Sequence, residues 1–363
     1  MARPTHALID CEALKNNFAL AESAQNGFCM PIVKANAYGH GVDNVCNTLH
    51  TAPAFGVASI DEALELRKLS IKQPILLLEG TFKADEIEVA SAENMWLMVE
   101  NQQQKNQILA ASVKRPLRIW LGLDTGMHRL GFQPTEINDV YHSLSASGKI
   151  DRIAVLATHF AYANDLKHEM TIQQMECFDQ THTKIDVPDG HALQQSLANS
   201  AAILGWPASL RDWQRPGYLL YGNSPISDSE KSYGLTPVMT FKSAIISIRT
   251  IKAGASVGYE AAWTARRDSI IATISVGYGD GYPRHAENGT PVLVGNKRCP
   301  LVGRVSMDMI TVDVTDCEST KIGDDATLWG PQLPVNEVAQ HCNTNGYELL
   351  SAVTSRVPRI VHN

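Results

Sequence analysis

One lysine of this chain has the surroundings that amine chemistry requires. Lys34 ends a short apolar run, 30–34, and the segment after it consists largely of small residues and glycine as far as Gly41. An amine at the end of a strand can form a Schiff base with an aldehyde cofactor or a carbonyl substrate. Small neighbours let a planar ligand approach the backbone, and the Tyr38 hydroxyl is placed to meet an anionic group. Taken alone, such a segment more often marks a solvated strand end, so the rest of the chain must decide.

The elements that must position this lysine form a repeating pattern over the first two thirds of the chain. Eight short apolar runs alternate with segments of helical spacing; the runs are 30–34, 55–58, 74–79, 95–99, 117–124, 152–159, 192–197 and 212–219. Helix start signals lie between them, among them Asp10 as an N-cap and the capping-box sequence 59–62. Eight strand–helix units predict an α/β fold with a (β/α)8 barrel of the TIM type. The last two runs are the least regular, because glutamines interrupt them.

The pattern changes at about Leu235. Segments rich in Val, Ile and Thr follow one another with glycine turns between them and one helical segment, 335–341; the predicted strands are 237–242, 243–252, 269–276, 291–294, 309–314 and 326–329. We therefore expect two domains, a barrel domain over 1–234 and a mostly β C-terminal domain over 235–363.

Composition narrows the class of protein. The chain has 363 residues, 44% of them hydrophobic and 19% charged, as in soluble globular proteins. A formal net charge of −7 gives no reason to expect binding to nucleic acid or to an anionic membrane. We expect neither a secretory signal nor a membrane span. The seven cysteines are scattered and form no C-x-x-C pair, which argues against disulfides and a zinc site and favours the cytoplasm.

A barrel of this type places its chemistry where strands end and loops begin, on one face. Lys34 ends the first predicted strand, and His159 ends the sixth. The segment 124–129 follows the fifth strand, and Asn199 with Ser200 follows the seventh. Arg215 lies inside the eighth run, so its position depends on where that strand ends. Four of five reactive positions at one face indicate a shared site.

With these segments in order, the chain closely resembles alanine racemase, a family of pyridoxal 5′-phosphate (PLP) enzymes with a barrel and a C-terminal β domain. The resemblance rests on segments that span nearly the whole chain; they are 33–41, 124–131, 158–160, 199–201, 215–217, 258–259, 276–284, 303–308 and 356–359. It implies PLP-dependent interconversion of L-alanine and D-alanine, either for peptidoglycan precursors or for D-alanine catabolism. It also implies a homodimer in which the β domain contributes to the partner's active site.

The resemblance further implies two catalytic bases. Lys34 would carry the cofactor and act as one base, and Tyr259 would be the other, supplied by the partner subunit to the opposite face. Inversion of an α-carbon needs a proton removed on one face and returned on the other, so two opposed groups suit it. The cofactor takes up the carbanion charge, and the protein positions and tunes it. From spacing alone, Tyr259 could equally be an ordinary strand aromatic.

The remaining site residues are also assigned by resemblance. Arg215 would contact the pyridine nitrogen, and His159 would link this arginine to the tyrosine base. The phosphate would be bound by the group Tyr38, Asn199, Ser200, Gly217 and Tyr218. Arg129 would bind the substrate carboxylate, with Met307 and Asp308 supplied by the partner, and the entryway would include Tyr282 and Ser355. Without the resemblance, each of these residues has an ordinary structural explanation. Arg215 could equally hold a loop in place, and His159 could be a hydrogen-bonded residue at a strand end. Asn199 could be a helix N-cap, and Met307 could belong to a hydrophobic core.

Two positions depart from the family's common pattern. Many members carry a carbamylated lysine where this chain has Gly122, and that negative charge steadies the carboxylate-binding arginine. We expect a bound anion such as chloride, or water, to orient Arg129 instead. Many members also have a tyrosine at the position of Ser355, and its loss predicts some activity on amino acids larger than alanine.

Three other functions remain open at this stage. A racemase of broad specificity, acting on serine, lysine, arginine or other amino acids, is left open by Gly122 and Ser355. A decarboxylase of the same architecture is disfavoured, because that family pairs the pyridine nitrogen with an acidic residue and not with an arginine such as Arg215. A non-catalytic PLP-binding homeostasis protein would need only the barrel, and the β domain with Tyr259 argues against it.

Overall fold

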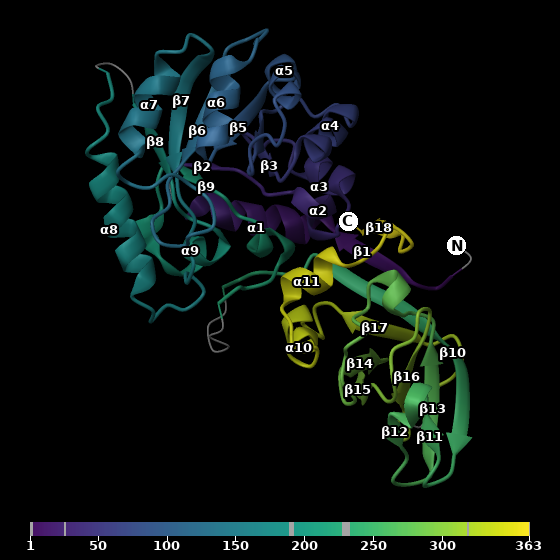
Figure 1. Ribbon diagram of the computed structural model, residues 1–363. Helices are drawn as coiled ribbons and strands as arrows, with labels where there is room; N and C mark the ends of the chain where they lie inside the picture. Colours follow the sequence, from purple (N-terminus) through teal and green to yellow (C-terminus); the bar gives the residue numbers. More distant parts are fainter. Residues whose placement is uncertain (1–2, 25–26, 189–191, 227–232, 318, 363) are drawn as a thin grey trace.

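The computed structural model describes residues 3–24, 27–188, 192–226, 233–317 and 319–362. Figure 1 shows two parts, a barrel surrounded by helices and an elongated β domain that extends away from it. Within the described ranges, no helix is both long enough and apolar enough to cross a membrane.

Eight parallel strands build the barrel, as predicted. They are β2 (Phe28–Cys29), β3 (Phe55–Val57), β4 (Ile75–Leu77), β5 (Met95–Val99), β6 (Leu117–Gly122), β7 (Ile150–Ala157), β8 (Gln194–Ser196) and β9 (Trp213–Gln214). Strands β3 to β8 form one sheet, and β2 pairs with β9. Parallel bridges between Ile32 and Gly56 and between Asn199 and Arg215 join the two sets, so the ring of strands closes.

Helices follow most of these strands and cover the outside of the barrel (Figure 1). They are α1 (Cys11–Ser23), α2 (Lys34–Tyr38), α3 (Val42–Thr48), α4 (Ile60–Lys68), α5 (Asp85–Ala92), α6 (Gln102–Ala110), α7 (Ile137–Ser145), α8 (Met170–His182) and α9 (Ser200–Gly205), with short 3₁₀ turns η1 (Pro207–Ser209) and η2 (Tyr218–Tyr221). Asp10 caps α1 as predicted, since its side chain accepts a hydrogen bond from the Ala13 N–H at 2.8 Å. Helix α4 begins where the capping-box sequence predicts, but the Ser59 side chain makes no cap bond.

The irregular strands β8 and β9 tolerate glutamine because these side chains are hydrogen-bonded. Gln194 Oε1 accepts from the Trp213 indole N–H at 3.0 Å, and Gln214 Nε2 donates to the Arg211 carbonyl at 2.7 Å. Polar groups satisfied in this way can be buried at little cost. Strand β9 ends at Gln214, which places Arg215 directly at a strand end.

The C-terminal domain is mostly β, as predicted. Its elements are β10 (Met239–Ile251), β11 (Ser256–Val257), η3 (Tyr259–Ala261), β12 (Trp263–Thr264), β13 (Ser269–Ile274), η4 (Tyr278–Asp280), β14 (Pro291–Val294), β15 (Lys297–Pro300), β16 (Ile310–Asp313), β17 (Asp325–Trp329), α10 (Val335–Gln340), α11 (Gly346–Ser351) and β18 (Arg359–His362). The two strands predicted over 237–252 are one long strand, β10. It passes from pairing with β1 and β17 to pairing with β13, with a register shift between Ile245 and Ser247.

The first strand, β1 (His6–Asp10), belongs to the sheet of the second domain. It runs antiparallel to β10 and parallel to β18. Although the predicted barrel domain begins at residue 1, residues 6–10 therefore pair with strands from the far end of the sequence. The first strand of the chain is therefore part of the sheet of the C-terminal domain, and the barrel strands follow it in the sequence.

A buried asparagine on α1 joins the barrel to the segment that leads into β10. Asn17 is 1% exposed, and its Nδ2 donates to the carbonyls of Leu220 (3.0 Å) and Thr236 (2.8 Å). Its Oδ1 accepts from the Thr236 N–H at 3.0 Å. The Asn17 side chain thus forms hydrogen bonds with three main-chain groups, one in η2 and two in the segment before β10.

We predict that Asn17→Ala lowers the free energy of unfolding by about 1–3 kcal/mol, because it removes three hydrogen bonds and leaves the buried Leu220 carbonyl without this partner. Asn16→Ala, at the neighbouring exposed position of the same helix, is the matched control and should change it by less than about 0.5 kcal/mol. Thermal unfolding of both variants measures the difference. Equal stabilities of the two variants would contradict this role of Asn17.

Candidate functional site

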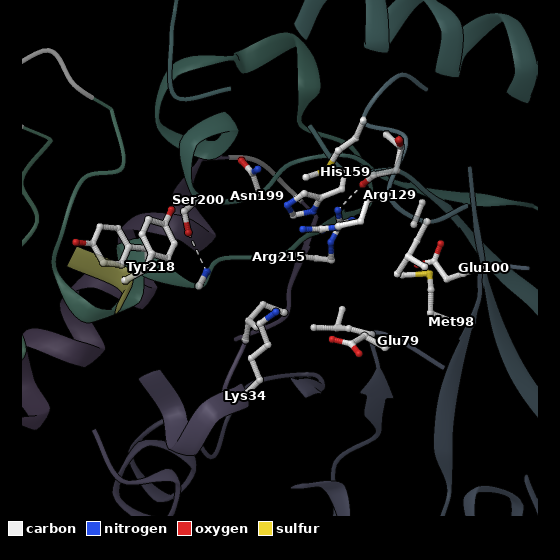
Figure 2. A pocket seen from close by; sticks show the side chains of 18 of the residues that line it. Lys34, Glu79, Met98, Glu100, Arg129, His159, Asn199, Ser200, Arg215 and Tyr218 are labelled. Atoms are coloured by element: carbon white, nitrogen blue, oxygen red, sulfur yellow. Dashed lines mark hydrogen bonds between the residues drawn. The ribbon is translucent and has the colours of Figure 1, made fainter. Parts of the chain in front are cut away.

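A pocket of about 720 Å³ opens at the C-terminal ends of the barrel strands. Residues directly after successive strands line it, among them Glu79, Glu100, Asp124, His159, Asn199 and Arg215. Figure 2 shows Lys34 facing the arginine and histidine side chains across the pocket. Of the residues singled out by sequence, the structure brings together Lys34, Tyr38, Arg129, His159, Asn199, Ser200, Arg215, Gly217 and Tyr218.

Lys34 opens a left-handed turn and not the end of a strand. The four residues of 35–38 all have φ between 50° and 52°, and Gly39 continues the turn with φ of 78°. Non-glycine residues pay a steric cost in this conformation, and consecutive ones need strong support from their surroundings. The turn has main-chain hydrogen bonds from the Ala37 N–H to the Val33 carbonyl (2.9 Å) and from the Gly39 N–H to the Ala35 carbonyl (3.0 Å).

Side chains from three regions of the chain hold this turn. The Glu62 carboxylate accepts from the N–H groups of Ala35 and Ala58, both at 2.7 Å, in place of a capping box. Asn36 Oδ1 accepts from the Val42 N–H at 2.8 Å. From the C-terminal domain, Arg359 Nε donates to the Gly39 carbonyl at 2.9 Å. The position of Lys34 is therefore fixed by both domains.

Gly39 is required for space as well as for its backbone conformation. A Cβ there would collide with the Leu350 carbonyl oxygen of α11, which packs against the turn. The glycine allows the second domain to close over the segment that carries Lys34.

The Arg215 guanidinium is 6% exposed and surrounded by main-chain acceptors. Nη1 donates to the Ser196 carbonyl at 3.0 Å and also to the Ser196 hydroxyl, and Nη2 donates to the Thr158 carbonyl at 2.5 Å. Burial lowers the pKa of Arg215 to about 10, and the negative charge of Glu100 opposes that shift. Arg215 is thus a fixed, charged donor at neutral pH.

His159 faces the cavity among positive charges. Desolvation in the barrel mouth and, after it, the positive charges of Arg215, Arg129 and Lys34 together lower the pKa of His159 to about 3, although the side chain is exposed to the open pocket. The imidazole is therefore neutral at neutral pH. The His159 carbonyl accepts from Gln174 Nε2 at 3.0 Å, which helps to hold its main chain. Among the described residues, no hydrogen bond joins the His159 ring to Arg215.

Hydroxyls and main-chain N–H groups form a cradle suited to an anion at one end of the pocket. Ser200 Oγ accepts from the N–H groups of Gly217 (2.9 Å) and Leu219 (3.3 Å), so it shapes the loop after β9. A Cβ at Gly217 would lie 2.8 Å from the Tyr38 hydroxyl oxygen and would fill this space. Tyr218 begins η2, where a helical turn leaves its first N–H groups unpaired. Asn199 lines the pocket and also caps α9, accepting from the Ala202 N–H at 3.1 Å.

Arg129 lines the pocket and is exposed to it. Asp124 shapes the loop that carries this arginine, since its carboxylate accepts from the N–H groups of Gly126 and His128, each at 3.0 Å, and pairs with the His128 ring. Space next to Gly122, where we expected an anion or water, contains the side chain of Glu100.

The second set of predicted residues lies in the β domain and does not line this pocket. Tyr259 is 71% exposed at the β11–β12 hairpin, which Figure 1 shows at the end of the β domain remote from the barrel. Met307 is 52% exposed, and Ser355 is also exposed. In a single chain these residues are therefore separate from Lys34.

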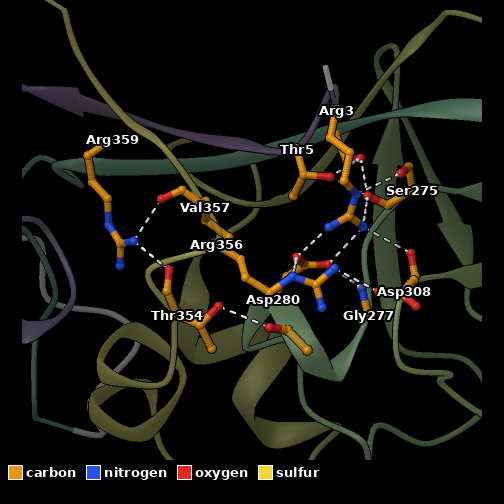
Figure 3. Close-up of polar contacts among 12 residues, drawn as sticks. Arg3, Thr5, Ser275, Gly277, Asp280, Asp308, Thr354, Arg356, Val357 and Arg359 are labelled. Carbon is orange, nitrogen blue, oxygen red and sulfur yellow. Dashed lines mark hydrogen bonds and ion pairs between the residues drawn. The ribbon is translucent and has the colours of Figure 1, made fainter. Parts of the chain in front are cut away.

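Two arginines and two aspartates fix the loop that carries Met307 (Figure 3). The fully buried Asp280 carboxylate pairs with Arg3 at 2.7 Å and with Arg356 at 3.5 Å. Asp308 pairs with Arg356 at 2.7 Å, and its carbonyl accepts from Arg3 at 3.2 Å. The cluster holds residues 277–281 against residues 306–308, and the Met307 carbonyl accepts from the Gly279 N–H at 2.9 Å.

The prediction that Tyr282 lines an entryway is wrong. Its side chain is 1% exposed, its hydroxyl is buried, and its ring stacks on Trp329 with centroids 6.3 Å apart. A side chain enclosed in the core of the β domain cannot border an entrance. Tyr278, four residues earlier, is instead 38% exposed, and its N–H donates to the Ser306 carbonyl beside Met307.

Sequence reasoning missed several residues of the pocket. Helix α11 brings Tyr347, Glu348 and Ser351 into the lining, and the Tyr347 ring stacks on Tyr218 with centroids 3.8 Å apart. No local signal marks these positions. Met98 and Glu100 also line the pocket, and Glu100 has a signal, because it directly follows a predicted strand.

Comparisons with known proteins agree with the resemblance. The family model for the alanine racemase N-terminal domain matches residues 9–225, and that for the C-terminal domain matches residues 238–361. The chain is 46% identical to the biosynthetic alanine racemase of Pseudomonas aeruginosa, over 98% of this chain and 99% of that protein. A crystal structure of the P. aeruginosa biosynthetic enzyme matches with a TM-score of 0.94 at 45% identity, covering 99% of this chain and 100% of that chain. A structure of alanine racemase from Bartonella henselae with covalently bound pyridoxal phosphate matches with a TM-score of 0.89 at 29% identity, covering all of both chains.

A buried histidine next to the Lys34 turn should make stability depend on pH. Burial lowers the pKa of His40 to about 4, below its ordinary value of 6.5 in the unfolded chain. The stability that comes from its neutral form is thus complete above pH 6.5 and is lost as the pH falls toward 4, by up to about 3 kcal/mol. We predict that His40→Asn, which can still donate to the neighbouring carbonyls, flattens the fall in melting temperature between pH 7 and pH 5. The exposed His50→Asn is the control, and an unchanged slope in His40→Asn would contradict the assignment.

Proposed function

Because the chain belongs to the alanine racemase family, whose members depend on PLP, we propose that its barrel pocket interconverts L-alanine and D-alanine with Lys34 and Tyr259 as opposed bases. The observation that carries this proposal is the convergence of one amine, one buried arginine and an anion cradle in a single pocket.

The residues of the pocket fit PLP. Lys34 offers an amine for the aldehyde. The hydroxyls of Tyr38 and Ser200 and the main chain at Gly217 and Tyr218 form a cradle for the phosphate, which Gly217 keeps open. Arg215 is the donor available to the pyridine nitrogen.

When bound, PLP supplies an electron sink for the charge that develops at the α-carbon. The protein's own groups do the rest. The Lys34 amine removes or returns a proton on one face, and the Tyr259 hydroxyl does so on the other. Arg129 holds the substrate carboxylate with a fork of two donors. Arg215 keeps its own proton and donates without giving it up, and neutral His159 adds no further positive charge beside it.

We also propose a homodimer in which each active site takes Lys34 from one subunit and Tyr259, Met307 and Asp308 from the other. Tyr259 is exposed and lies at the end of the β domain remote from its own barrel, which supports delivery to another subunit. Several large apolar side chains of the β domain are exposed, which favours burial against another subunit; they are Ile246, Tyr259, Tyr278, Met307 and Met309. Residues 1–234 would then form the PLP-binding domain, and 235–363 would complete the partner's site. Seven free cysteines support a reducing cytoplasmic location.

The two-base assignment predicts different losses for the two variants. Lys34→Ala should lose both racemisation and α-proton exchange in deuterated water. Tyr259→Phe should lose racemisation by about 10²–10⁴-fold, since one proton transfer is no longer catalysed. It should still exchange the α-proton of one enantiomer, because Lys34 still works on its own face. NMR of L-alanine and D-alanine measures both. Exchange of both enantiomers at equal rates in Tyr259→Phe would contradict the assignment.

Shared sites predict recovery of activity when two inactive variants are combined. In a mixed dimer of Lys34→Ala and Tyr259→Phe subunits, one site has both substitutions and the other has neither. Random reassociation should therefore restore about a quarter of the wild-type activity. If both residues came from one chain, every site would contain one substitution and no activity would return.

A further inference from the structure

Gly122, at the end of β6, is a glycine for reasons of space. Its φ is not in the left-handed region, so its backbone conformation is open to any residue. A Cβ at this position, however, would overlap Glu100 Oε2 and lie 2.7 Å from Glu100 Cδ. A glycine inside a strand often marks the close approach of another group, and here that group is a carboxylate.

The backbone of Glu100 is fixed so that this approach is maintained. Glu100 follows β5, which pairs with β6 through Val99 and Leu121. Its N–H donates to Gln104 Oε1 at 2.8 Å, and its carbonyl accepts from the Gly131 N–H at 3.2 Å. Gly131 belongs to the loop after β6 that also carries Arg129. The same residue therefore anchors the arginine loop and extends a carboxylate into the pocket.

Positive charge predominates around this carboxylate. Burial is the main reason why the pKa of Glu100 is raised to about 7; Arg215 and Arg129 oppose that rise, and Asp124 adds to it. Glu79, Lys34 and neutral His159 also line the same pocket. Figure 2 shows Glu100 beside Met98 on a wall of the pocket near the two arginines. Among the described residues, the Glu100 carboxylate has no hydrogen bond or ion pair of its own, so its charge is available to the arginines.

Arg129 needs such a counter-charge. It is a long, exposed side chain, and among the described residues it has no ion pair. The nearest acidic residue in sequence, Asp124, already binds two main-chain N–H groups and the His128 ring. With Lys34 and Arg215 in the same pocket, three cations repel one another unless an anion lies among them.

We propose that Glu100 is a positioning residue that occupies the space left by Gly122 and holds Arg129 ready for the substrate carboxylate. The inference rests on the proposed function, because it takes Arg129 as the carboxylate-binding group. No bound chloride is then required, because the negative charge is built into the strand end. A fixed arginine loses less side-chain freedom when it binds, which improves substrate binding more than the chemical step.

The test uses PLP-loaded wild type and three variants. Glu100→Gln keeps the shape and removes the charge, Glu100→Ala leaves a cavity, and Gly122→Ala displaces the side chain without changing its charge. We expect the KM for alanine to rise about tenfold in each, with kcat changed less than about threefold. Binding of propionate, which carries a carboxylate but cannot react, should weaken by a similar factor in the same variants. The cofactor absorbance should match that of wild type.

Two further readouts separate a charge effect from a packing effect. Sodium formate should lower the KM of Glu100→Ala toward the wild-type value, because the anion fits the cavity, whereas neutral formamide should not. In wild type, propionate binding should strengthen as the pH rises through about 7, and this dependence should be absent in Glu100→Gln.

The proposal is overturned if KM and propionate binding in all three variants stay within twofold of wild type. It is also overturned if formate and formamide act equally on Glu100→Ala. Failure of the wild-type enzyme to racemise alanine would instead refute the proposed function, and propionate binding would still report on Glu100.

Discussion

The left-handed turn after Lys34 is the constraint on which the site depends. Four consecutive non-glycine residues adopt a conformation that each of them alone would avoid, so the turn exists only because other parts of the chain hold it. Glu62 holds it from the barrel, and Arg359 holds it from the C-terminal domain. The Lys34 amine is thus positioned by contacts between the two domains, and α11 of the second domain lines the pocket even within one chain.

Charge balance is the second organising feature of the pocket. Lys34, Arg129 and Arg215 bring three cations together, and desolvation in the pocket together with their charges lowers the pKa of His159, so it does not become a fourth cation. Glu100 supplies the opposing charge without a bound ion. The absence of a side chain at Gly122 leaves the space that the Glu100 carboxylate occupies.

Much of this arrangement could be predicted from the sequence, because strand ends and turn residues carry local signals. Seven of the eight predicted runs overlap barrel strands, whereas the first run, 30–34, follows β2 (Phe28–Cys29). The rule that chemistry follows strand ends located His159, and it located Lys34 only as a residue of the turn after β2. The same rule would have found Glu100, which directly follows β5. Whether a given side chain is buried or exposed could not be predicted in this way. Tyr278 and Tyr282 share one glycine-rich segment, and only packing against Trp329 shows which of them is enclosed. The pairing of β1 with β18 joins opposite ends of the sequence, and no local pattern reports it.

The most direct test of the account is to find which amine the cofactor joins. Reduction of the PLP-loaded enzyme with borohydride fixes the cofactor to that amine, and peptide mass spectrometry then identifies the residue. The account predicts that the phosphopyridoxyl group lies on Lys34 alone, and that loosening the turn with Glu62→Ala reduces the labelled fraction. Label on a different lysine, or full labelling of Lys34 after the turn has lost this support, would contradict it.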